Sequence, residues 1–173
     1  MVIEKGTSDD VSELEKLYND LNDYSSTHIN YPGWIKDIYP VRQTAIDGIG
    51  EDSLFVLRIN KTIAGSVILN HYPEDAYHQV QWGISAGYDD VIVIHTLIVH
   101  PDFMKKGIGE ALLNFAKEYS LNNGIISIRL DVSVDNLPAI RLYEKMGYQY
   151  VATVDLGLGY EHLKWFKLYE LIL

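Results

Sequence analysis

The chain has 173 residues, of which 47% are hydrophobic and 22% are charged, and its formal net charge is −10. This length and composition predict one globular domain spanning residues 1–173. A net negative charge repels polyanions, so we expect no nucleic-acid partner. The chain contains no cysteine, which excludes disulfides, thiolate metal sites and a cysteine nucleophile. We expect no bound metal.

The N-terminal sequence MVIEKGTSDD has no apolar run after its charged residues, so we expect no signal peptide. No stretch approaches the roughly 20 apolar residues that a membrane-spanning helix needs. These two features predict a cytoplasmic protein without a membrane partner.

The first predicted element is a helix capped by Thr7 or Ser8. Its apolar residues recur at helical spacing on one face: Val11, Leu14, Leu17, Tyr18 and Leu21. The next segment, NDYSSTHINYPGW, breaks this spacing and indicates a loop. Residues 40–47 then predict a second, weaker helix.

Extended segments follow. The short apolar stretches SLFVLRI and IAGSVILN predict the two strands of a hairpin that turns at Asn60 and Lys61. A loop rich in His and Tyr is expected over residues 71–90. The longest apolar run, VIVIHTLIV, is rich in β-branched residues and predicts a central strand buried on both faces.

The C-terminal half begins with a helix whose apolar face comprises Ile108, Ala111, Leu112, Phe115, Ala116 and Tyr119. Asn123 and Gly124 predict its end. A strand (ISIRLDVSV), a short helix over residues 136–145 and two terminal strands (YQYVATVDL and LKWFKLYELIL) complete the pattern. Because helices are few and strands occur in adjacent pairs, we expect an α/β (α+β) fold, with a mixed sheet of about six to seven strands flanked by about four helices.

Two glycines lie between the central strand and the helix after it, in the sequence MKKGIG. Gly107 and Gly109 let a ligand come close to the main chain. The helix N terminus offers unpaired N–H groups and a positive dipole end, and Lys105 and Lys106 add charge. This combination is typical of a phosphate or pyrophosphate site, although a tight strand–helix turn without a ligand is the alternative.

Two common phosphate motifs do not match this turn. A P-loop needs Gly-Lys-Ser/Thr at the helix start, and Gly109 is followed by Glu110. A dinucleotide fingerprint needs a third glycine, and Leu112 holds that position.

Two blocks of the sequence resemble the GCN5-related N-acetyltransferase (GNAT) superfamily. LIVHPDFMKKGIGEALL is similar to that family's strand, glycine-rich turn and helix. RLDVSVDNLPAIRLYEKMGYQYV is similar to its later strand, its Asn-x-x-Ala-x-x-x-Tyr-Glu-Lys helix and its Gly-Phe/Tyr ending. The blocks stand in the family's order and spacing. Met104 departs from the pattern, because the family has Gln or Arg there.

The resemblance implies acetyl-CoA as co-substrate and an amine as acceptor. In this family the backbone of the central strand binds the pantetheine arm, which implicates Leu97, Ile98 and Val99. The turn and helix start would bind the pyrophosphate: Lys105, Lys106, Gly107, Ile108, Gly109 and Glu110. Asn136 would contact the cofactor, although a helix N-cap is the simpler role for it. Arg141 and Lys145 are either solvated helix charges or contacts to the 3′-phosphate.

Tyr143 matches the family's tyrosine, which donates a proton to the leaving thiolate. A tyrosine stays protonated at neutral pH and can donate; the alternative is a core aromatic residue. His95 is the candidate proton acceptor, because it lies on the same face of the central strand as Leu97 and Val99. The alternative for His95 is a structural histidine bonded to a backbone carbonyl.

By the same resemblance, the acceptor site comprises residues 24–39, which include Tyr24, Tyr31, Trp34 and Tyr39, and residues 155–161, which include Asp155 and Glu161. Aromatic rings and carboxylates suit a cationic amine, although the aromatics also suit the edge of a core.

We therefore expect an N-acetyltransferase acting on a small cationic or aromatic primary amine. Direct transfer in a ternary complex is expected because there is no cysteine to carry the acetyl group. The alternatives are a protein N-terminal or lysine acetyltransferase, and a non-catalytic acetyl-CoA-binding module. A homodimer is one option for the oligomeric state.

Overall fold

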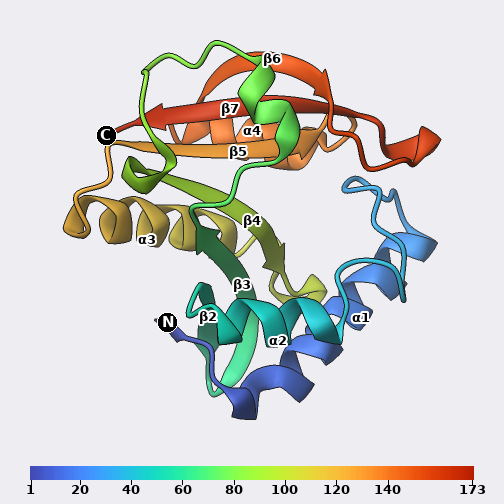
Figure 1. Ribbon diagram of the computed structural model, residues 1–173. Helices are drawn as coiled ribbons and strands as arrows, with labels where there is room; N and C mark the ends of the chain where they lie inside the picture. Colours follow the sequence, from blue (N-terminus) through green and yellow to red (C-terminus); the bar gives the residue numbers. More distant parts are fainter. The chain divides into compact units, whose positions relative to one another are not determined.

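The computed structural model describes residues 1–173 and contains seven strands and four α-helices (Figure 1). The strands form one mixed sheet in the order β1-β2-β3-β4-β5-β7-β6, which confirms the expected α/β class. The helices are α1 (Val11–Thr27), α2 (Arg42–Gly50), α3 (Ile108–Asn122) and α4 (Leu137–Lys145). The strands are β1 (Val2–Lys5), β2 (Leu54–Ile59), β3 (Thr62–Asn70), β4 (Val91–Val99), β5 (Ser127–Ser133), β6 (Gln149–Asp155) and β7 (Trp165–Ile172).

The chain divides into two compact units. The first unit comprises Met1–Asn30, Trp34–Leu69 and Thr96–Phe115, and the second comprises Tyr31–Gly33, Asn70–His95 and Ala116–Leu173. The single domain expected from chain length stays a prediction. None of the helices has the length and apolarity needed to cross a membrane.

In the first unit, α1 and α2 pack against each other (Figure 1). Thr7 is the N-cap of a short 3₁₀ turn, Ser8–Asp10, that leads into α1, and its backbone N–H donates to the Asp10 carboxylate at 2.9 Å. The helix continues through Thr27, so the loop expected from residue 22 onward is wrong in its first six positions. Tertiary contacts stabilise this extension. Asn22 donates to the Tyr39 carbonyl at 3.3 Å, and Lys36 pairs with Asp23 at 2.7 Å.

The expected hairpin joins β2 to β3. Asn60 and Lys61 both have positive φ, at 50° and 69°, as a tight turn between twisted strands requires. Strand β1 was not expected from the sequence. Its four residues are largely exposed, and its structure depends on antiparallel pairing with β2.

The apolar core of the first unit contains the predicted face of α1, one side of the hairpin and Ile98 of β4: Leu14, Leu17, Tyr18, Leu21, Ala45, Leu54, Val56, Ile63, Ile68 and Ile98. Met104 packs against this core. The residue that departs from the family pattern thus acts as an apolar anchor for the turn before α3.

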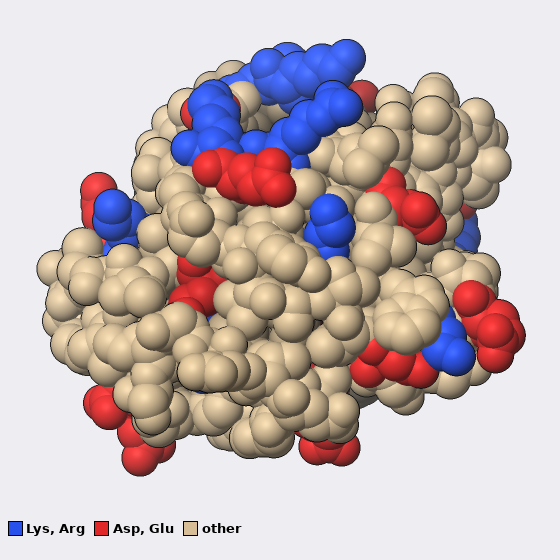
Figure 2. Space-filling view, turned by 90° about the horizontal axis from the view of Figure 1, so that it is seen from above, with Lys and Arg blue, Asp and Glu red and all other residues tan.

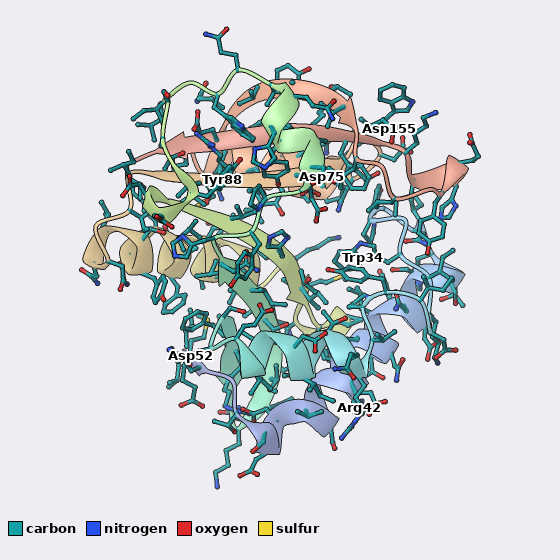
Figure 3. The ribbon with its side chains drawn as sticks, in the orientation of Figure 1. Trp34, Arg42, Asp52, Asp75, Tyr88 and Asp155 are labelled. Carbon is teal, nitrogen blue, oxygen red and sulfur yellow. The ribbon has the colours of Figure 1, made fainter.

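In the second unit, β4 runs parallel to β5, and β5, β7 and β6 pair antiparallel. The long β3–β4 loop, which carries Asp75 and Tyr88 (Figure 3), is tied to this sheet by Arg129. Arg129 donates to Glu170 at 3.0 Å and to the Ile84 carbonyl at 2.9 Å. Its guanidinium lies 4.4 Å from the Trp82 ring centroid. The loop is therefore bound by a buried charge pair, although its sequence indicated only irregular structure.

Candidate active site

Strand β4 pairs with β5 over only the first half of its length. Its ladder with β5 pairs Val91 to Ile94 with Ser127 to Leu130 and ends there. Thr96, two residues on, has φ of 47°, which is uncommon for a β-branched residue. Its hydroxyl is hydrogen-bonded to that of Tyr39. A main-chain irregularity of this kind, held by a tertiary contact, is frequent at functional sites.

The exposure of β4 alternates beyond its paired half. His95, Leu97 and Val99 are partly buried, whereas Thr96 and Ile98 are buried. This alternation agrees with the expectation that His95, Leu97 and Val99 share a face. The expectation that the whole strand is buried on both faces is wrong for its second half, because only the first four residues are buried without interruption.

The turn before α3 has an unusual backbone. Lys105 and Gly107 both have positive φ, at 60° and 79°. A Cβ at Gly107 would meet no atom within 4 Å, so its φ, and not crowding, favours glycine. Ala111 donates to the Gly107 carbonyl at 3.0 Å, which closes the first turn of α3. The turn and helix start therefore present amide groups suited to an anion.

The two lysines of this turn differ. Lys106 donates to the Asp102 carbonyl at 2.7 Å and lies 5.1 Å from the Phe103 ring centroid. Lys105 is exposed. Figure 2 shows one face of the molecule on which Lys and Arg side chains gather at one edge and acidic side chains are dispersed. A net charge of −10 is thus compatible with local positive sites for an anionic ligand.

In the second unit, Tyr143 is buried on α4 at 7% exposure. Its ring centroid lies 5.9 Å from that of Tyr148 and 6.4 Å from that of Tyr169. Burial raises the pKa of Tyr143, and the charge of Asp131 raises it further. The hydroxyl is therefore protonated at neutral pH, as a proton donor requires. Asn136 caps α4, because its side chain accepts from the Ala139 N–H at 3.3 Å.

His95 ends the part of β4 that belongs to the second unit. Its Nε2 lies 3.0 Å from the Tyr72 carbonyl oxygen, which only accepts hydrogen bonds. In the neutral ring the proton is therefore on Nε2, and Nδ1 carries the lone pair. This contact matches the structural alternative for His95 and leaves the other ring nitrogen able to accept a proton.

Asp131 and Tyr77 were not singled out in the sequence. The Tyr77 hydroxyl donates to Asp131 Oδ2 at 2.7 Å. Burial raises the pKa of Asp131. The hydrogen bond from Tyr77 and the charge of His95 lower it, and the charge of Glu74 raises it. The net result is a pKa above the ordinary value. One signal was present: Asp131 is an acidic residue inside the apolar strand sequence ISIRLDVSV.

The residues expected at the acceptor site belong to both units. In the first unit, Tyr24 stacks on His28 at 3.9 Å, and Trp34 meets Tyr39 edge to face at 5.4 Å. In the second unit, Asp155 at the end of β6 (Figure 3) accepts from the Gly157 N–H at 2.9 Å. Its carboxylate also lies 3.7 Å from Lys164. Asp155 thus has partners within the chain.

Comparison with known proteins agrees with this architecture. Residues 14–148 match the family model described as Acetyltransferase (GNAT) family. The chain is 30% identical over 138 residues to an uncharacterized N-acetyltransferase of Methanocaldococcus jannaschii, covering 76% of this chain and 57% of that protein. It is 28% identical over 116 residues to streptothricin acetyltransferase of Escherichia coli, covering 65% of this chain and 58% of that protein.

A solved structure shows the same fold. The Salmonella typhimurium protein yncA, determined with its cofactor acetyl-CoA, has a TM-score of 0.71 at 15% identity over 99% of this chain and 92% of that one. The aligned part of this chain spans little more than half the length of the two curated relatives. The first sequence block, which contains the turn between β4 and α3, lies inside the matched region, and the second block overlaps its end. The chain belongs to the GNAT acetyltransferase family.

Proposed function

We propose that this chain transfers an acetyl group from acetyl-CoA to a primary amine, and that the amine is a small cationic or aromatic molecule. The observation that carries the proposal is the turn before α3, where Lys105 and Gly107 have positive φ directly before the start of a 15-residue helix, whose dipole favours an anion. Family membership supports it, and the streptothricin acetyltransferase relative supports a small-molecule acceptor.

Binding of acetyl-CoA is assigned first to main-chain groups. The pyrophosphate would accept hydrogen bonds from the turn and first helical residues, Lys105 to Glu110, where the helix dipole favours negative charge. The pantetheine arm would pair with the backbone of Leu97, Ile98 and Val99, beyond the residues of β4 that pair with β5. Asn136 would contact the cofactor from the start of α4.

The chemistry requires a proton acceptor for the amine and a proton donor for the thiolate. His95 Nδ1 is proposed as the acceptor, because Nε2 is engaged with the Tyr72 carbonyl. Tyr143 is proposed as the donor, because it matches the family's proton-donating tyrosine and its hydroxyl is protonated at neutral pH. With no cysteine in the chain, the acetyl group would pass directly from the thioester to the amine.

An amine panel tests the proposal. The purified chain is incubated with acetyl-CoA and one amine: butylamine, putrescine, spermidine, tyramine, a peptide with a free α-amino group or a peptide whose only free amine is a lysine side chain. CoA release is followed with a thiol reagent. Because the chain has no cysteine, the reagent reports CoA alone. Calorimetry measures acetyl-CoA affinity in wild type and in Gly109→Val, whose branched side chain would block the turn.

We expect turnover of at least one small amine and loss of acetyl-CoA binding in a folded Gly109→Val variant. Binding of acetyl-CoA without turnover of any amine would reduce the chain to a binding module. A preference for the peptides would replace the small-molecule acceptor with a protein. Unchanged acetyl-CoA affinity in Gly109→Val would remove the turn from the cofactor site.

A further inference from the structure

We propose that Asp131 binds the ammonium group of the acceptor and so selects a cationic primary amine, an inference that rests on the proposed acetyltransferase function. Asp131 directly follows Leu130, the last residue of β5 that pairs with β4. Leu130 pairs with Ile94 of β4, and His95 directly follows Ile94. In parallel strands, residues at equivalent positions point to the same face, so Asp131 and His95 are neighbours where the pairing ends.

The carboxylate of Asp131 is held in one orientation through Oδ2, which leaves Oδ1 available to accept a hydrogen bond from a ligand. Tyr77 holds Oδ2 through a 2.7 Å hydrogen bond, and Tyr77 is itself buried at 1% exposure. Oδ1 accepts no hydrogen bond from the protein. An ionised carboxylate offers about four acceptor positions, and an ammonium group offers three donors. The residue can therefore accept a ligand's N–H while Tyr77 keeps its orientation.

The surroundings of Asp131 contain no permanent cation. The ionisable groups that act on it are His95 on β4, Glu74 and Tyr77 of the β3–β4 loop, and Tyr143 on α4. On β7, the residue opposite is the uncharged Leu168. The buried Arg129 two positions earlier on β5 is bound to Glu170 instead. Asp131 is partly buried, and a carboxylate that loses part of its hydration without gaining a cation is costly, so the acceptor's ammonium group would compensate it.

The same placement suits the proton transfer. The bound ammonium group gives one proton to His95 Nδ1 and becomes a neutral amine. Its nitrogen attacks the thioester carbonyl carbon, the N–C bond forms and the C–S bond breaks. The thiolate takes the Tyr143 proton, and the second proton lost by nitrogen replaces it. The positive charge moves from the amine to the imidazolium, so Asp131 stays beside a cation before and after the transfer.

Two substitutions separate this role from a structural one. Asp131→Asn removes the charge but keeps an oxygen that can accept from Tyr77. Tyr77→Phe removes the hydroxyl and keeps the charge. Glu144→Gln is the matched control, because Glu144 also accepts from a tyrosine, Tyr169, at 2.8 Å. Each variant is assayed with the cationic panel amine of highest kcat/KM, and its acetyl-CoA affinity and Tm are measured.

For Asp131→Asn we expect kcat/KM to fall by about 10- to 100-fold, mainly through the amine KM, with unchanged acetyl-CoA affinity. Tyr77→Phe should lose less, and Glu144→Gln should match wild type. The opposite order, with Asp131→Asn near wild type and Tyr77→Phe impaired, would make Asp131 a structural partner of Tyr77 and overturn the inference. Absence of amine turnover in wild type itself would overturn the proposed function and this inference together.

Discussion

Two aspartates, one in each unit, have opposite electrostatic environments: Asp10 directly precedes α1, and Asp131 lies within β5. Asp10 in the first unit accepts from the Thr7 N–H at 2.9 Å and pairs with Arg58 at 2.5 Å. Burial acts to raise its pKa, but the Thr7 and Arg58 hydrogen bonds outweigh burial and hold the pKa below its ordinary value. Asp131 in the second unit has a tyrosine hydroxyl as its partner, and its pKa is raised.

The difference separates a structural carboxylate from one suited to a ligand. Arg58 gives Asp10 a cation within the fold, so its charge stabilises the native state. Asp131 has no such cation, so its charge costs stability until a ligand supplies one. Residues that destabilise the fold in this way are often retained for function.

The largest loss of stability is expected at the buried Arg129–Glu170 pair, whose side chains are 2% and 3% exposed. This pair tests whether a buried charge needs an oppositely charged partner. Arg129→Met leaves Glu170 buried without its cation and should lower the free energy of unfolding by about 3–5 kcal/mol. Urea denaturation measures the loss. Lys164→Met, which breaks an exposed pair with Asp155, is the control and should lose less than about 1 kcal/mol. Similar losses in the two variants would show that burial does not set the cost.

Tyr143 lies near Asp131, and we expect Tyr143 to have a catalytic role. Tyr143→Phe deletes one oxygen and keeps the ring, and kcat should fall on the order of 10²-fold if the hydroxyl protonates the thiolate. Acetyl-CoA affinity, measured by calorimetry, should change little. Tyr148→Phe is the control, because the Tyr148 hydroxyl is buried without a hydrogen-bond partner. Equal losses of kcat in both variants would assign the effect to aromatic packing.

Asp10→Asn removes a carboxylate that is paired with Arg58. The lowered pKa means that Asp10 contributes stability above its unfolded-state pKa, and that this contribution is lost as pH falls through its folded-state pKa. At neutral pH we expect the variant to be less stable by about 1–2 kcal/mol. Thermal unfolding followed from neutral to strongly acidic pH should show the difference shrinking. A constant difference over that range would contradict the ionic explanation.

Asp131→Asn should change stability in the opposite direction. A raised carboxyl pKa contributes stability below the unfolded-state pKa, and that contribution is lost as pH rises through the folded-state pKa. At neutral pH the ionised group therefore costs stability, and the variant should be more stable by on the order of 0.5–1 kcal/mol. The gain should vanish in acid, as measured by Tm against pH. A loss of stability at neutral pH would show that Asp131, like Asp10, is a structural carboxylate.

Much of the architecture follows from local sequence. The hairpin turn at Asn60 and Lys61, the nine-residue strand β4 and the Asn136 cap were all predicted, because each depends on residues that are near neighbours in the chain. The same holds for the glycine turn before α3, since strand, turn residues and helix start are contiguous. The two motif blocks that resemble the GNAT family are local as well, and the family model confirms that resemblance.

Other features depended on contacts between distant segments. Strand β1 exists through its pairing with β2, and the last turns of α1 are held by residues of the following loop, so no periodicity indicated them. Tyr77 and Asp131 are 54 positions apart, and only the parallel register of β4 and β5 makes Asp131 a neighbour of His95. The sequence by itself determined the four helices, six of the seven strands and the turn that suits an anion. Only the tertiary structure decided which carboxylate has a cation and which has none, because electrostatic partners are chosen by distance in space.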